Sequence, residues 1–128
     1  MAMFTHVTVG TNDLARARAF YDATLGALGW KRLFDLGENG SAWGLDGVMG
    51  FLALRPRDGK PACYGNGATI SFAAPSREAV AAFHAAGLAH GGTDEGAVGP
   101  RSFAPNAFGG YLRDPDGNKI AAYCHAPG

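Results

Sequence analysis

The chain has 128 residues, 47% of them hydrophobic and 20 of them glycine, which suits one packed domain rich in tight turns. Eleven basic and eleven acidic residues are scattered along the sequence and balance to a formal net charge of zero, which argues against nucleic acid or a membrane as a partner. The two cysteines, Cys63 and Cys124, form no CxxC pair, and no basic segment followed by a long apolar run opens the chain. We therefore expect two free thiols, no signal peptide and a cytoplasmic location.

The first half of the chain predicts a strand, a helix and three further strands. The opening "FTHVTVG" alternates between two faces, as a half-buried strand does. Asn12 or Asp13 is suited to cap a helix whose apolar residues recur at helical spacing, and Gly26 is suited to end it. The turns "GENG" and "DG" then separate three predicted strands, over residues 30–36, 41–45 and 48–56.

The second half repeats this order. "ATISFAA" alternates like the first strand, and Ser76 is suited to cap a second helix. One constant offset aligns the two halves and matches His6 with Thr69. A slightly larger offset aligns "LDGVMGF" with "PDGNKIA", and so matches Phe51 with Ala121. The extra residues of the second half fit the Gly/Pro-rich segment "GAVGPRSFAPNAFGG", which we expect to be a long loop.

An internal repeat of this length predicts two copies of one supersecondary unit. We therefore expect an α+β fold in which two tandem βαβββ modules form a curved, half-open mixed sheet with the helices on the outside. Within a single domain, module one should cover about residues 3–56, a linker 57–66 and module two 67–125.

The alternation also predicts which side chains face the helices and which face away. The face packed on the helices should carry Val7, Val9, Leu52, Leu54, Ile70 and Phe72. The opposite face should carry His6, Thr8, Met49, Phe51, Thr69, Ser71, Ala121 and Tyr123. This mixture of polar and apolar residues is typical of a ligand cavity, although a half-solvated sheet face has the same composition.

From this pattern we predict one set of ligand-binding residues: His6, Thr8, Trp43, Phe51, Thr69, Ser71, Arg101, Tyr111, Ala121 and Tyr123. Arg101 lies in segment 97–107, a candidate lid, where its guanidinium is able to anchor a carboxylate. Two simpler readings stay open: a lone loop arginine is commonly solvated, and strand aromatics such as Trp43 are more often core. Neither cysteine has an adjacent base, so a nucleophilic role is unsupported, and the sequence leaves the catalytic residues unidentified.

The paired modules, the opening "HV-V-T-DL--A--FY---LG" and the late "DPDGNKI" together resemble the vicinal oxygen chelate superfamily. That superfamily includes glyoxalase I, bleomycin-resistance proteins, fosfomycin-resistance enzymes and extradiol dioxygenases. The resemblance covers about residues 3–125 and is to small glyoxalase-like bacterial members. In metal-using members it implies ligands on the first and last strands of each module, at positions corresponding here to His6, Phe51, Thr69 and Ala121. Only His6 is a ligand-type residue, so we expect no metal and no other cofactor.

Other donors in the sequence have local roles that compete with metal binding. His84 falls on the second predicted helix, His90 near its end, and His125 near the end of the chain. Asp114 and Asp116 belong to the turn "DPDG", where aspartate bonds backbone amides. His6 itself stays open between a metal ligand, a catalytic base and a hydrogen-bonded strand residue, and its isolation favours a place in the pocket wall.

The resemblance implies a glyoxalase/bleomycin-resistance-like protein that binds a small, partly apolar molecule in a concave sheet cavity without the usual metal. The alternative is a metal-dependent lyase, isomerase or dioxygenase that holds a divalent metal with unrecognised ligands, and a third possibility is a non-catalytic dimerisation module. Whether the chain is an enzyme stays open. We expect a homodimer, because half-open sheets leave edges and apolar surface that a second copy covers.

Overall fold

The computed structural model of the chain describes residues 3–128, in which one βαβββ unit follows another. Module one comprises β1 (Val7–Gly10), α1 (Leu14–Ala27), β2 (Lys31–Asp35), β3 (Gly40–Leu45) and β4 (Val48–Leu54). Module two comprises β5 (Ile70–Ala73), α2 (Arg77–Ala89), β6 (Thr93–Pro100), β7 (Phe108–Arg113) and β8 (Lys119–Cys124). No helix within residues 3–128 is long and apolar enough to cross a membrane.

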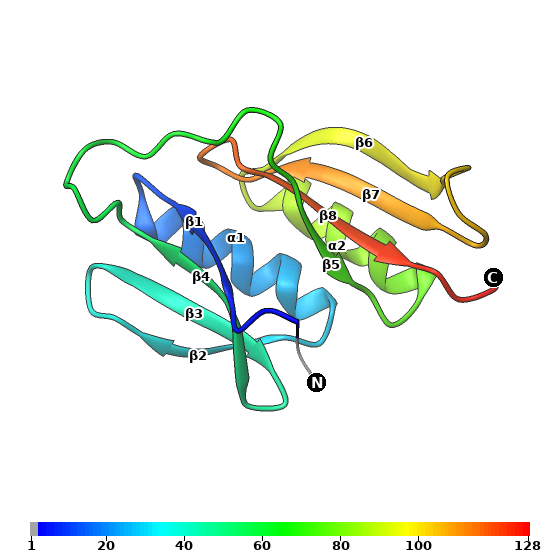
Figure 1. Cartoon of the computed structure of the whole chain (residues 1–128), viewed down its shortest axis with the longest axis horizontal. Coiled ribbons are helices and arrows are strands. Elements are labelled where there is room, and N and C mark those ends of the chain that lie inside the picture. Colours follow the sequence, from blue (N-terminus) through cyan, green and yellow to red (C-terminus); the bar gives the residue numbers. More distant parts are fainter. Residues whose placement is uncertain (1–2) are drawn as a thin grey trace.

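Each module has its own four-stranded mixed sheet (Figure 1). The strand order is β1-β4-β3-β2 in module one and β5-β8-β7-β6 in module two. In both sheets the first strand of the module pairs in parallel with the last, and the other pairs are antiparallel. The predicted α+β fold of two tandem βαβββ modules is therefore confirmed. The strands form two sheets and not the single curved sheet that was predicted, because within residues 3–128 no ladder joins the edge strands β1 and β5.

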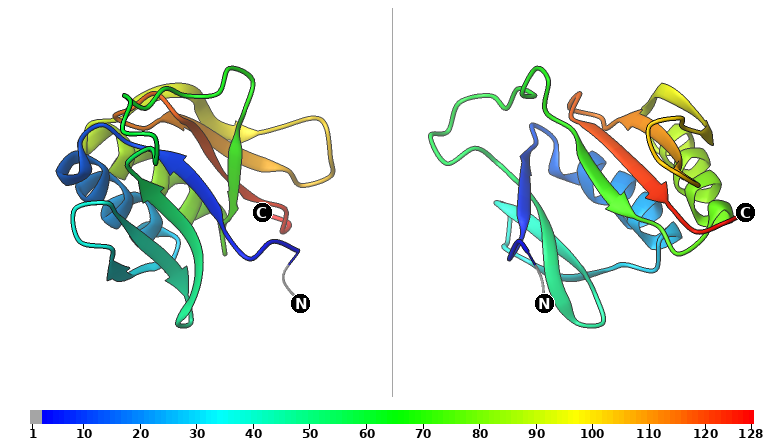
Figure 2. Two further views of the ribbon diagram at one scale, coloured as in Figure 1. Left: turned by 60° about the vertical axis from the view of Figure 1, so that its left-hand side comes forward. Right: turned by 45° about the vertical axis from the view of Figure 1, so that its right-hand side comes forward.

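The two helices begin where the sequence predicts. The side chain of Asp13 accepts a hydrogen bond from the Arg16 amide at 3.1 Å, and Ser76 accepts one from the Ala79 amide, also at 3.1 Å. Each cap satisfies an amide that has no partner inside the helix. The helices pack on one another and lie on the same side of both sheets (Figures 1 and 2). The opposite sides of the sheets are left without a helical cover.

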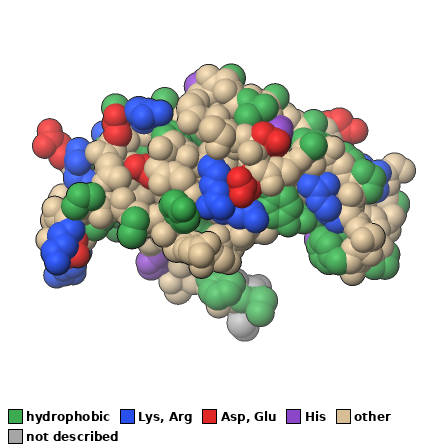
Figure 3. Space-filling view, turned by 90° about the horizontal axis from the view of Figure 1, so that it is seen from above, with side chains coloured by type: hydrophobic (Ala, Val, Ile, Leu, Met, Phe, Trp, Pro, Cys, Tyr) green, Lys and Arg blue, Asp and Glu red, His purple; other side chains and the backbone are tan. Residues whose placement is uncertain are grey.

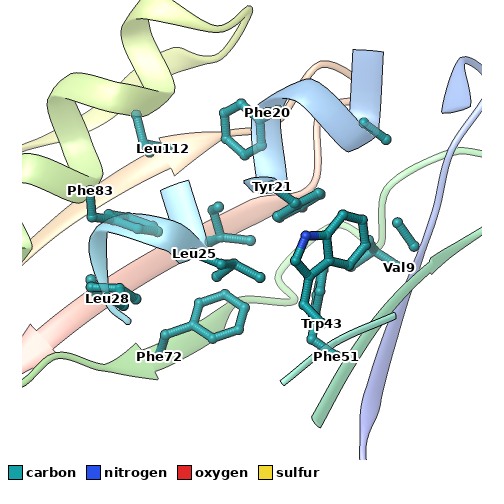
Figure 4. Packing of buried hydrophobic residues seen from close by; sticks show 14 of the residues in the cluster. Val9, Phe20, Tyr21, Leu25, Leu28, Trp43, Phe51, Phe72, Phe83 and Leu112 are labelled. Carbon is teal, nitrogen blue, oxygen red and sulfur yellow. The ribbon is translucent and has the colours of Figure 1, made fainter. Parts of the chain in front are cut away.

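One aromatic core joins the modules under the helices (Figure 4). The rings of Tyr21 and Phe51 lie 4.7 Å apart, and those of Phe51 and Phe72, which belong to different modules, lie 5.3 Å apart. Trp43 is also fully buried there, and its indole nitrogen donates to Asp22 at 2.9 Å. The prediction that Phe51 lies on the open face is therefore wrong, and so is the prediction that Trp43 and Phe51 line the ligand site.

A β-bulge explains this error. In the β3–β4 ladder Trp43 pairs with Phe51, but the next residue, Gly44, pairs with Met49, so that β4 contains one extra residue at this point. An extra residue reverses which face each later side chain takes, and alternation counted from the hairpin turn then fails. In the β1–β4 ladder Phe51 pairs with Val7 on the core face. The neighbours Leu52 and Leu54 consequently lie on the opposite face, contrary to the prediction.

The expected long loop of module two is shorter than predicted. Residues 96–100 of the segment belong to β6 and residues 108–110 to β7, so that only residues 101–107 connect the two strands. The pairing of β6 with β7 shifts register between Asp94 and Gly96 and again between Gly96 and Gly99. An edge strand tolerates glycine, proline and bulges because only one of its sides must pair. The Gly/Pro composition that predicted a loop therefore marks an irregular edge strand.

The "DPDG" turn of module two fastens the two modules together. Asp114 accepts hydrogen bonds from the amides of Asp116 and Asn118, both at 2.9 Å, as expected of an aspartate in such a turn. The hydroxyl of Tyr21 in module one donates to the same carboxylate at 2.5 Å, and the amide nitrogen of the Asn118 side chain donates to the Gly10 carbonyl at 3.0 Å. Burial raises the pKa of Asp114, although the hydrogen bonds from Tyr21 and Asn118 oppose that shift. Burial and the nearby Asp114 raise the pKa of Tyr21, which therefore remains a donor at neutral pH.

Candidate functional site

The side of the module-two sheet that α2 does not cover is here named the free face. Ladder partners share a face, so Ser71, Tyr111 and Ala121 lie on it together, and Tyr123 lies beside them. Tyr123 is able to lie across the sheet because its ladder partner is Gly109, where a Cβ atom would come within 2.7 Å of the tyrosine ring. Ala121 and Tyr123 form a small apolar cluster with Tyr111 that is separate from the core.

Three hollows adjoin at Ser71. The first, of about 590 Å³, lies beside β1 and β5 and includes His6, Thr69 and Ser71 among apolar residues such as Trp30 and Met49. The second, of about 390 Å³, is lined by Ser71, Phe72, Ala73, Phe103, Tyr111, Tyr123 and His125. The third, of about 410 Å³, is lined by Thr69, Ser71, Glu95, Gly96, Arg101, Tyr111 and Lys119. Open apolar walls with a few convergent polar groups are typical of small-molecule sites.

The structure therefore brings together six of the ten predicted site residues: His6, Thr69, Ser71, Arg101, Tyr111 and Tyr123. Thr8 lines a separate hollow of about 190 Å³ near Cys63, and Ala121 is fully buried beneath its neighbours on the free face. Trp43 and Phe51 lie in the core, as described above. A larger depression, of about 770 Å³, follows the linker between the modules, and none of the ten residues lines it.

Two tyrosine hydroxyls form the polar centre of the free face. The hydroxyls of Tyr111 and Tyr123 lie 2.5 Å apart, and the two rings meet edge to face with centroids 5.7 Å apart. Burial raises the pKa of Tyr123, and the hydrogen bond with Tyr111 raises it further, whereas Arg101 lowers it. The net rise keeps this hydroxyl protonated at neutral pH, where it serves as a hydrogen-bonding group.

Two cations lie close to the ring of Tyr111. The guanidinium of Arg101 lies 5.6 Å from the centre of the Tyr111 ring, and the Lys119 ammonium lies 5.2 Å from it. Arg101 is also held by carbonyls of its own strand end, at 2.7 Å from Ala97 and 2.9 Å from Gly99. The sequence analysis missed Lys119, although strand alternation places it on the same face as Ala121 and Tyr123. The signal that could have found it is that alternation, counted back from Ala121 to Lys119, where β8 begins.

Comparison with known proteins places this geometry in a family. The model of the glyoxalase/bleomycin resistance protein/dioxygenase superfamily matches residues 3–122. The chain belongs to this superfamily. The resemblance to the vicinal oxygen chelate proteins inferred from the sequence is thereby confirmed. No curated protein gives a significant sequence match to the chain.

Solved structures of glyoxalase-like proteins share the fold. A glyoxalase/bleomycin resistance protein from Albidiferax ferrireducens T118 is 44% identical, with a TM-score of 0.86 over 98% of this chain and 100% of that one. A glyoxalase-related enzyme from Fulvimarina pelagi has 19% identity and a TM-score of 0.73, covering 96% of this chain and 88% of that one. Lactoylglutathione lyase from Agrobacterium tumefaciens has 20% identity and a TM-score of 0.63, covering 96% of this chain and 93% of that one. The last two likenesses show the fold alone.

The side chains at the superfamily's expected ligand positions do not fit a divalent ion. The pairing of Leu52 with Thr8 corresponds to that of Ala121 with Ser71, so Leu52 replaces Phe51 as the position equivalent to Ala121. The four positions are then His6, Leu52, Thr69 and Ala121, and imidazole is the only strong donor among them. Within residues 3–128 no three His, Cys, Asp or Glu side chains are grouped so that they could hold a metal ion.

The other histidines have partners elsewhere. His84 pairs with Asp94 at 2.8 Å on the surface of module two. The ring of His90 lies 2.8 Å from the Ala86 carbonyl at the end of α2, as its position predicts. His125 stacks on Tyr123 with centroids 5.8 Å apart. His6 is exposed just before β1, and its Nδ1 atom lies 3.0 Å from the Thr5 hydroxyl.

Proposed function

We propose that this glyoxalase-like chain binds a small, partly apolar molecule on the free face and in the adjoining cleft beside β1. The observation that carries the proposal is the meeting of three hollows at Ser71. One end of this surface is apolar, with Trp30 and Met49, and the other carries the hydroxyls of Tyr111 and Tyr123. Such a surface is able to bury an apolar body while orienting a polar group.

We propose further that binding requires no metal. One imidazole among Leu52, Thr69 and Ala121 supplies too few donors for selective binding of a divalent ion. The metal-dependent alternative, a lyase, isomerase or dioxygenase, would need ligands from outside these positions. A metal ion that binds only the folded state stabilises a protein by about 2.7 kcal/mol when its free concentration is about a hundred times its dissociation constant. We therefore expect the melting temperature to be the same with chelator and with added nickel, zinc, iron or manganese, and one equivalent of tightly held metal would contradict the proposal.

A second copy of the chain is the proposed partner. Four large apolar side chains are exposed near the cleft: Met3 at 94%, Phe4 at 74%, Leu45 at 45% and Val48 at 69%. Acidic and basic side chains are interspersed on the face seen in Figure 3, which supports neither a nucleic acid nor an anionic membrane as a partner. The free thiols Cys63 and Cys124 suit the reducing cytoplasm. Light scattering at micromolar concentration tests the homodimer, and a species of 13.2 kDa alone would contradict it.

Small aromatic probes test the binding proposal directly. Phenylacetamide and phenylacetate are titrated into isotope-labelled protein, and we expect amide shifts for at least one of them at Thr69, Ser71 and Tyr111. Ser71→Trp should abolish these shifts, because the indole fills the point where the three hollows meet. Ala82→Trp, on the exposed side of α2, is the matched control and should leave them unchanged. Absence of shifts on this surface with both probes would overturn the proposed function.

A further inference from the structure

We infer that the free face selects a carboxylate, held by Arg101, Lys119 and the Tyr111–Tyr123 hydroxyl pair, on a molecule whose apolar part lies beside Phe103. This inference rests on the proposed function and narrows it to one chemical class, small aromatic or short alkyl monocarboxylates.

The first argument is charge. Arg101 and Lys119 both line the hollow of about 410 Å³, and both lie close to the ring of Tyr111. None of the ion pairs formed within residues 3–128 includes either of them. The carboxylate in the same hollow, Glu95, is engaged by Arg113 at 3.0 Å. The hollow therefore presents two cations without acidic partners, and an anion entering it gains charge-assisted hydrogen bonds.

The second argument is preorganisation. A guanidinium has five N–H donors, and those of Arg101 bond the carbonyls of Ala97, Gly99 and Pro100 at 2.7, 2.9 and 3.3 Å. Three donors so used leave two N–H groups for a ligand and hold the side chain in one position. Because the arginine is ordered during folding, a ligand does not bear the entropy cost of ordering it. A solvated loop arginine, the simpler alternative from sequence, would lack these three contacts.

The hydroxyl pair supplies a further donor. When two hydroxyls share one hydrogen bond, one donates and the other keeps its own hydrogen free. The free hydrogen of Tyr111 or Tyr123 is then available to one carboxylate oxygen, and the Arg101 fork to the other. Neutral hydroxyls are required for this, which agrees with the raised pKa of Tyr123.

The third argument is the adjoining apolar space. The hollow of about 390 Å³ shares Ser71 and Tyr111 with the cationic one and adds Phe72, Ala73 and Phe103. Phe103 is 69% exposed and meets the Tyr123 ring edge to face at 5.6 Å, so a bound apolar group would cover it. Carboxylate and apolar body are thus accommodated side by side, which favours a compact amphiphilic anion.

Phenylacetate and phenylacetamide test the inference, because they differ in charge but hardly in shape. At low ionic strength we expect phenylacetate to bind about tenfold more tightly or better, since hydrogen bonds to charged groups are the stronger ones. Arg101→Gln should remove most of this preference, whereas the affinity for phenylacetamide should change by less than about twofold. Lys119→Gln should weaken phenylacetate binding by a smaller factor, about threefold, as expected for an ammonium on a flexible stem.

Three controls keep the result interpretable. Arg57→Gln and Lys60→Gln remove cations that line the linker depression and should leave both affinities unchanged. Tyr123→Phe removes one hydroxyl of the pair but leaves the contacts of Arg101 with the Ala97, Gly99 and Pro100 carbonyls in place. It should lower the affinity for phenylacetate even if Arg101→Gln alters residues 101–107. Equal affinities for the two probes, or full phenylacetate binding by folded Arg101→Gln and Tyr123→Phe proteins, would overturn the inference and leave the proposed function standing. Binding of neither probe would defeat both.

Discussion

Module one and module two repeat the same βαβββ order but expose different chemistry. Module one contributes the large rings of Tyr21, Trp43 and Phe51 to the shared core. Module two keeps both of its tyrosines, Tyr111 and Tyr123, on the open side of its sheet. The repeat therefore retains the path of the backbone and not the role of each side chain.

One pair of equivalent helix positions shows the same contrast. The offset that matches the two helices places His84 in the position of Tyr21. Tyr21 is fully buried and bonds a carboxylate of the other module, Asp114. His84 bonds a carboxylate of its own module, Asp94, whose side chain is 55% exposed. A polar contact within the core should matter much more for stability than its counterpart on the surface.

The largest effect should come from Phe51→Ala. Phe51 contacts the rings of Tyr21 and Phe72, and its loss leaves a cavity between the modules. We expect the free energy of unfolding to fall by about 3–5 kcal/mol, measured by urea denaturation. Phe103→Ala on the free face is the control and should change it by no more than about 0.5 kcal/mol. A loss below about 1 kcal/mol, roughly the value of burying one methylene group, would contradict the buried position of Phe51. It would favour the open face, where alternation in the sequence placed this ring.

A smaller loss, about 1.5–3 kcal/mol at pH 7, is expected for Tyr21→Phe, because the removed hydrogen bond goes to a buried charged group. The loss should depend on pH. Burial raises the pKa of Asp114 in the folded protein above the unfolded value of 3.8. The contribution of Asp114 to the free energy of unfolding therefore falls as the pH rises from 3.8 through the folded-state pKa. The hydrogen bond from Tyr21 lowers the folded-state pKa of Asp114. Without that bond the folded-state pKa is higher, so the loss of stability continues to a higher pH. Tyr21→Phe should therefore cost more at pH 7 than at pH 4, and a cost independent of pH would show that the hydroxyl does not act on Asp114.

His84→Ala should have a weaker effect, which is present at neutral pH and disappears in acid. The hydrogen bond from His84 is the main cause that lowers the pKa of Asp94, with a smaller share from the Gly96 amide. A lowered carboxyl pKa adds stability above the unfolded value of 3.8, and that stability is lost as the pH falls through the folded value. In the variant the pKa of Asp94 should move back toward 3.8 in a carboxyl NMR titration. An unchanged Asp94 pKa would mean that His84 and Asp94 do not interact in solution.

Sequence reasoning succeeded where a local signal carried the information. The caps Asp13 and Ser76 begin the helices, and the "DG" hairpin forms with Asp46 at φ 52° and Gly47 at φ 78°, as such a turn requires. It failed where a long-range pairing decided the outcome. The bulge beside Gly50 is visible only in the β3–β4 register, and it reversed the faces of Phe51 and Leu52.

The predictions for the candidate site succeeded and failed for the same reasons. Alternation from the first strand correctly brought His6, Thr69 and Ser71 to one cleft, because no bulge interrupts β1 or β5. Lys119 was missed although alternation counted back from Ala121 along the same strand places it on that face. The three carbonyl contacts that order Arg101 arise from the irregular end of β6, and no pattern of residue types predicts them.

The smallest effect on the free energy of unfolding should come from His6→Ala. Thr69→Ala, at the equivalent position of module two, serves as the comparison. His6 is exposed, and its ring nitrogen meets only the hydroxyl of the adjacent Thr5, at 3.0 Å. Substitutions at such positions change stability by no more than about 0.5 kcal/mol, so His6→Ala and Thr69→Ala should unfold at nearly the same urea concentration. A metal site would break this equality, because added zinc would then stabilise the unmodified protein and Thr69→Ala but not His6→Ala. We expect zinc to have no effect on any of the three, since His6 lies in the wall of an apolar cleft with no second strong donor at the equivalent positions.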